Sequence, residues 1–116
     1  MSFLEQIFQV LNGVLPNRVS YGTNIVDAND LHVDPFIVYQ EISDRVQTYA
    51  DNKSALRIIT YQITLVTESK EPTIEDQLEL ALYQSGFNYQ MITEYVNDDN
   101  SINRVYEIKQ EEIKYE

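Results

Sequence analysis

Within the β-type run 55–68, residues 59–66 alternate between two sets of side chains, and this period of two constrains the fold more than any other feature of the sequence. Because successive side chains of a strand point to opposite faces of the sheet, the alternation predicts a strand with one packed and one polar face. Such a strand needs other elements to cover its packed face. We expect Ile59, Tyr61, Ile63 and Leu65 on the packed face, and Thr60, Gln62, Thr64 and Val66 on the other.

A second β-type run covers residues 36–50, and the connection between the two runs, 51–54, reads Asp-Asn-Lys-Ser. Asp and Asn favour tight turns because their short side chains hydrogen-bond to nearby backbone groups. The two runs and their connection therefore predict a long hairpin over 36–68.

Further strand signals lie on either side of this hairpin. Every second position from Phe87 to Tyr95 is apolar, aromatic or threonine, as expected for a strand, and a turn follows at 97–100. These signals predict a C-terminal hairpin over 87–113. A short strand is expected at 18–22, followed by an irregular loop that extends to Pro35.

Two segments have helical periodicity instead. The first covers 2–15, where Ser2 and Glu5 have the spacing of a capping box and Pro16 stops the helix. The second covers 72–85, with proline at its start and glycine directly after its end. Their apolar stripes comprise Leu4, Ile7, Leu11 and Val14 in the first helix, and Ile74, Leu78, Ala81 and Leu82 in the second.

The predicted elements follow the order α-β-β-β-α-β-β over residues 1–116, a length typical of one domain. We therefore expect a single domain of the α+β class. It would have two layers, an antiparallel or mixed sheet of about five strands with both helices on one face.

Composition excludes several functions. The chain has no cysteine, which leaves no disulfide, thiol nucleophile or zinc–thiolate site. A formal net charge of −11 without a basic cluster argues against reading nucleic acid through its phosphates. No secretory leader and no membrane span are expected, since no apolar stretch approaches eighteen residues.

Candidate catalytic and metal-binding groups lack a motif. His32 is the only histidine, and it lies in the irregular loop near Asp27, Asp30 and Asp34, whose spacing matches no cation-binding loop.

A calcium loop counted from Asp99 also fails, because Arg104 stands where glycine is needed and Gln110 where glutamate is needed. The glycines Gly13, Gly22 and Gly86 are too far apart for a phosphate-binding loop. We therefore expect no catalytic residue, no cofactor and no metal, and a protein that is not an enzyme.

Tyrosine is unusually frequent, with nine residues and no tryptophan. Strand propensity and half-burial explain this enrichment, and so does a surface that packs against neighbouring proteins. Long hairpins also leave sheet edges that can serve as docking strips. Six of the tyrosines fall on predicted strands: Tyr39, Tyr49, Tyr61, Tyr89, Tyr95 and Tyr106.

The order of elements resembles the small tail completion or tail terminator proteins of long-tailed, siphovirus-type bacteriophages. Four segments carry the resemblance together with the N-terminal helix and the strand at 18–22, and it spans nearly the whole chain. The segments are 34–39, 61–67, 72–78 and 105–108.

The resemblance implies a subunit of a ring, usually of six copies, that caps the tail tube and presents a surface to the head–tail connector. Its place would be the virion neck, and the host cytoplasm during assembly. An acidic lumen would let DNA pass without binding, because like charges repel. We expect the subunit interface to include Arg45, Tyr49, Asp51, Asn52 and Arg57.

Two alternatives stay open. A head-side completion protein, either stopper or adaptor, would join the same neck from the other direction. An acidic DNA mimic would instead block a DNA-binding enzyme with carboxylates at phosphate-like spacing.

Overall fold

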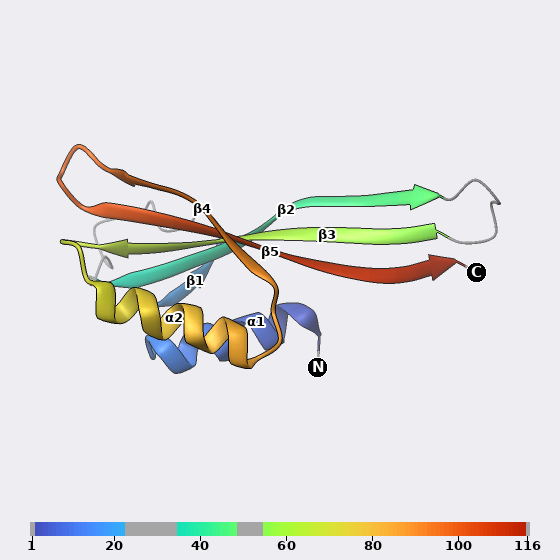
Figure 1. Cartoon of the computed structure of the whole chain (residues 1–116), viewed down its shortest axis with the longest axis horizontal. Helices are drawn as coiled ribbons and strands as arrows, with labels where there is room; N and C mark the ends of the chain where they lie inside the picture. Colours follow the sequence, from blue (N-terminus) through green and yellow to red (C-terminus); the bar gives the residue numbers. More distant parts are fainter. Residues whose placement is uncertain (1, 23–34, 49–54, 116) are drawn as a thin grey trace.

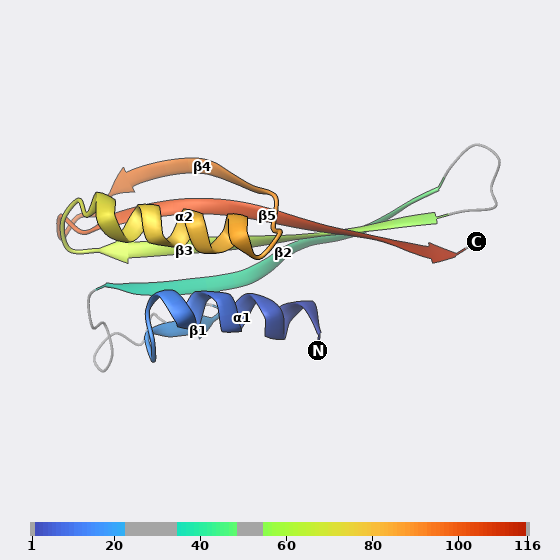
Figure 2. The same cartoon turned by 60° about the horizontal axis from the view of Figure 1, so that its bottom comes forward.

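A computed structural model describes residues 2–22, 35–48 and 55–115. Both helices lie on the same side of one twisted sheet (Figure 1). Turning the molecule shows α1 beside β2 and α2 over β3 and β5 (Figure 2). The elements are α1 (Phe3–Val14), β1 (Val19–Tyr21), β2 (Phe36–Thr48), β3 (Ala55–Thr67), α2 (Pro72–Gln84), β4 (Tyr89–Val96) and β5 (Ile102–Tyr115).

The sheet has the strand order β1-β2-β3-β5-β4, with β3 in the centre. Neighbouring strands are antiparallel except at one edge, where β1 runs parallel to β2 with Val19 opposite Ile37. The predicted α+β class, with two helices and a mixed five-stranded sheet, is confirmed. The predicted loop at 24–34 and turn at 51–54 lie outside the described residues.

The core lies between the helices and the sheet. The side chains predicted to form the packed face of β3 all belong to it, with Ile63 and Leu65 almost completely buried. Leu78 and Leu82 cover this face from α2, and Ile7 and Leu11 cover it from α1; all four have no exposed surface. Apolar burial on this one face is therefore what holds the two layers together.

The start of α1 and the end of α2 are both capped by hydrogen bonds. The Ser2 hydroxyl accepts a hydrogen bond from the Glu5 amide at 3.1 Å, and the Glu5 carboxylate accepts one from the Ser2 amide at 3.3 Å. This reciprocal pair satisfies two amides that α1 would otherwise leave free.

At the end of α2, Gly86 takes a φ of +85°. The Phe87 amide donates to the Leu82 carbonyl and the Gly86 amide to that of Tyr83, the two bonds of a Schellman motif. These two residues complete the helix end, and β4 begins only at Tyr89.

Two β-bulges change which face the charged side chains occupy. One bulge lies between Glu41 and Ser43 in β2, and the other between Met91 and Thr93 in β4. Each inserts one residue, so the alternation of faces shifts by one position beyond it. Asp44 consequently lies on the same face of the sheet as Ile59, and Glu94 on the same face as Tyr106.

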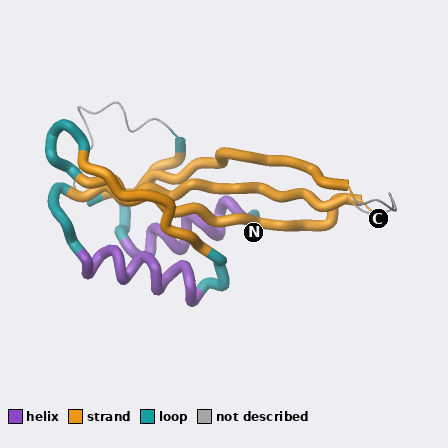
Figure 3. The backbone as a smooth tube through the Cα atoms, turned by 45° about the horizontal axis from the view of Figure 1, so that its top comes forward, coloured by secondary structure: helices purple, strands orange, loops and turns teal. Residues whose placement is uncertain are grey.

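The molecule is elongated, measuring 52 × 27 × 25 Å. Its radius of gyration is 15.9 Å, whereas a compact domain of this length has one of about 13 Å. Figure 3 shows the reason, since β2, β3 and β5 continue as a ribbon beyond the ends of the helices. We call this ribbon the arm; it comprises residues 43–48, 55–60 and 109–115.

Candidate functional site

The arm contains two of the five residues predicted for a subunit interface, Arg45 and Arg57. The other three, Tyr49, Asp51 and Asn52, lie outside the described residues. The two arginines are on opposite faces of the arm, because Arg45 is opposite Ile58 in the strand register and Arg57 is the next residue towards the start of β3. They differ sharply in what they contact.

Arg57 forms its ion pairs within its own chain. Its Nε and Nη2 donate to the two carboxylate oxygens of Asp44 at 2.9 and 2.7 Å, and its Nη1 donates to Glu112 at 3.2 Å. The hydrogen bonds to Asp44 raise the pKa of Arg57. Because these partners lie on β2 and β5, Arg57 on β3 links all three strands of the arm.

Arg45, by contrast, is exposed and forms no ion pair with any residue in the described ranges. In the register of the arm, Arg45, Ile58 and Glu111 form one row across β2, β3 and β5. Arg45 and Glu111 are therefore two strand spacings apart, about 10 Å, which is too far for a direct pair. The side chains of Arg45 and Glu111, at the two ends of this row, are both exposed to solvent.

The two outer edges of the arm have no strand partner among the described residues. β1 pairs only with residues 37–39 of β2, and β4 pairs only with residues 102–108 of β5. Beyond these points, each strand presents backbone N–H and C=O groups that a further strand could bind. The arm is thus a sheet segment with two open edges.

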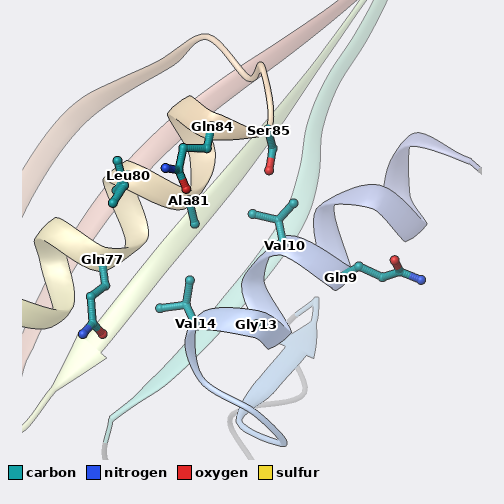
Figure 4. A pocket seen from close by; sticks show the side chains of 9 residues that line it. All are labelled: Gln9, Val10, Gly13, Val14, Gln77, Leu80, Ala81, Gln84 and Ser85. Carbon is teal, nitrogen blue, oxygen red and sulfur yellow. The ribbon is translucent and has the colours of Figure 1, made fainter.

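A shallow groove of about 540 Å³ lies between α1 and α2. Figure 4 shows Val10 and Val14 directed from α1 towards α2, with glutamines at the rims. A Cβ at Gly13 would meet nothing within 4 Å, so the groove is open at that point. The full lining is Gln9, Val10, Gly13, Val14, Gln77, Leu80, Ala81, Gln84 and Ser85.

No lining residue of this groove is ionisable, so it offers no group for acid–base or metal chemistry. Neutral amides beside apolar side chains are suited to contact with another protein surface.

A network of charged side chains joins α2 to β4 and β5. Arg104 donates to Glu94 at 2.9 Å and to Glu79 at 3.1 Å, and its Nε donates to the Tyr106 hydroxyl at 2.6 Å. That hydroxyl donates in turn to Glu79 at 2.7 Å. Burial of the Tyr106 ring and its bond to Glu79 raise the pKa of the phenol.

Lys70 extends the network to the start of α2. It contacts Glu75 and Glu94, each at 2.8 Å, and the Glu75 side chain is only 8% exposed. Because every acid has a cationic partner and the network closes over the core, its role is to fix α2 on the sheet.

These bonds give stability a specific dependence on pH. The hydrogen bond from Lys70, followed by that from Arg104, holds the pKa of Glu94 below its usual value. A depressed folded-state pKa stabilises the protein above the unfolded value, about 4.3, and this contribution is lost as pH falls through the folded value. We expect wild type to lose more unfolding free energy than Glu94→Gln between about pH 5 and pH 3.

Urea unfolding at a series of pH values measures this difference. Glu68→Gln is the matched control, because Glu68 is exposed and outside the network. Equal acid slopes for wild type and Glu94→Gln would contradict the role of Glu94.

The described residues do not form a metal site or a membrane-spanning helix. Within residues 2–22, 35–48 and 55–115, no three His, Asp or Glu side chains cluster as a metal site would require. His32, Asp27, Asp30 and Asp34 are outside these ranges. Neither helix in the described part is long and apolar enough to cross a bilayer.

Sequence reasoning missed Glu111 and the network around Arg104. No local pattern marks them, because the partners are far apart in the chain and meet only through strand order and bulges. The one available signal was the scarcity of bases, eight against nineteen acids, which makes each arginine worth locating.

No family model and no curated protein matches this sequence. A solved structure matches the fold, namely a chain from the virion of a native gene transfer agent particle. The two chains share 10% sequence identity with a TM-score of 0.52, and the match covers 91% of this chain and 92% of the other. At this identity the likeness shows a shared fold.

Proposed function

We propose that this protein is a structural subunit of a phage-like virion and acts as a tail terminator. In this role it forms a ring, of six copies in our proposal, that caps the completed tail tube and meets the head–tail connector. The observation that carries the proposal is the arm, a sheet segment with two open edges in an elongated chain. Such a segment suits repeated contact with other copies.

Two further observations support the proposal. The fold likeness extends over nearly the full length of a chain that belongs to a virion. The net charge of −11 would also let an acidic lumen pass DNA without binding it. Neither the groove nor the ion-pair network has the arrangement of a catalytic site.

The test is to mix the purified protein with assembled tail tubes and with head connectors. Light scattering would measure the mass, and negative-stain imaging would show where the protein binds. We expect ring-sized oligomers, or a cap at one end of each tube.

Binding only to the connector would favour a head-side completion protein. A monomer that ignores both and binds a DNA-processing enzyme would favour the acidic mimic. Either result would replace the terminator proposal.

A further inference from the structure

The two open edges of the arm have compatible directions. β2 and β5 are both antiparallel to β3, so they run the same way. In a ring, neighbouring copies are related by rotation and keep their strands in a common direction. The β5 edge of one copy would therefore meet the β2 edge of the next as a parallel pair.

The arm carries no excess of acids although the chain as a whole is strongly acidic. Its sequence has four bases, Arg45, Arg57, Lys109 and Lys114, and three acids, Asp44, Glu111 and Glu112. Two acidic chains repel each other over most of their surfaces. A segment without net negative charge is the place where they can approach most easily.

The rows of the arm specify a register between copies. If the rows continue from one copy into the next, Arg45 lies beside Glu111 of the neighbour at one strand spacing, about 4.8 Å. In the same register, Asp44 lies beside Gln110 and Val46 beside Glu112, so no like charges meet.

Slipped registers are less favourable. A slip of two residues in one direction places Asp44 beside Glu112, and a slip in the other places Arg45 beside Lys109. Both juxtapose like charges. A slip of one residue would place Arg45 and Glu111 on opposite faces of the extended sheet.

We propose that the β2 edge of one copy adds to the β5 edge of the next, with Arg45 paired to Glu111 across the contact. This inference rests on the proposed ring and names the contact that builds it. It makes Arg45 a specificity determinant, and it excludes Arg57, whose carboxylate partners are already in its own chain.

Charge reversal provides the first test. We expect Arg45→Glu and Glu111→Arg each to weaken self-association about tenfold or more, because each places like charges side by side. The double variant should return to within about threefold of wild type. Sedimentation over a range of concentrations, alone and with tail tubes, measures these changes.

Two controls keep this result interpretable. Arg45 and Glu111 are exposed and unpaired within the described ranges, so thermal unfolding of the variants should match wild type. Glu68→Arg reverses an exposed charge outside the arm and should leave association unchanged. Failure of the double variant to recover would overturn the pairing.

Covalent trapping tests the register directly, because the chain has no cysteine. Arg45→Cys and Glu111→Cys in one chain are too far apart to join each other, but adjacent strands of two copies suit a disulfide. We expect mild oxidation to produce a ladder of cross-linked copies. Arg45→Cys with Lys109→Cys, the slipped register, should not produce one.

The outcomes separate this inference from the proposed function. Oligomers that assemble but cross-link only through the slipped pair, or through neither pair, would overturn the inference and leave the ring intact. A chain that stays monomeric at high concentration and on tail tubes would overturn both.

Discussion

Leu78→Ala is expected to lower the free energy of unfolding by about 3 kcal/mol, with a fall in Tm of about 12 °C. The Leu78 side chain has no exposed surface and belongs to the core between α2 and the sheet. Alanine would remove buried carbon atoms and leave a cavity that close-packed neighbours refill only in part.

Leu80→Ala is the matched control, since it makes the same chemical change in the same helix. Leu80 is 54% exposed and lines the groove between the helices. Its replacement should change the unfolding free energy by less than about 0.5 kcal/mol. Urea denaturation measures the free energy of unfolding of both variants. Similar losses in the two would mean that Leu78 is not buried between α2 and the sheet.

Arg104→Met is expected to cost about 2 kcal/mol of unfolding free energy and about 8 °C in Tm. Methionine retains an apolar stem but removes every donor that Arg104 directs at Glu79, Glu94 and Tyr106. The Arg104 side chain is 18% exposed, so its partners would be only partly rehydrated after the change.

The control for this prediction is Arg45→Met, which removes an arginine that has no ion pair in the described part of the chain. We expect it to change unfolding by less than about 0.5 kcal/mol. Calorimetry of the two variants gives the comparison. Equal stability would show that the network around Arg104 contributes nothing beyond solvated surface pairs.

Local pattern was sufficient to predict most of the fold. The alternation at Ile59, Tyr61, Ile63 and Leu65 identified the packed face, because burial on a sheet follows the period of the strand. Helix ends were equally local, since capping by Ser2 and termination at Gly86 depend on residues a few positions away.

Strand order and side-chain direction could not be predicted in this way. The bulge after Glu41 determines that Asp44 shares a face with Arg57 and that Arg45 does not. Without the inserted residue, strict alternation would place Asp44 and Arg45 on the opposite faces. A bulge leaves no composition signal in this run, so the face that Arg45 occupies was visible only in the structure.

The bulge in β4 has the same effect on Glu94, which it directs towards Lys70 and Arg104. The charged partners of the network come from α2, β4, β5 and the segment before α2. Their meeting depends on β5 lying between β3 and β4, which no short sequence window encodes.

The central position of β3 also determines when the sheet can be finished during synthesis. β2 and β3 are consecutive strands, but the other neighbour, β5, follows only after α2 and β4, and its pairing joins Ala55 to Tyr115. A ribosome adds about 5–20 residues per second. One edge of β3 therefore stays unpaired for several seconds while α2, β4 and β5 are synthesised. The nascent chain must stay apart from other nascent chains over that interval, because an unpaired strand edge can bind another chain.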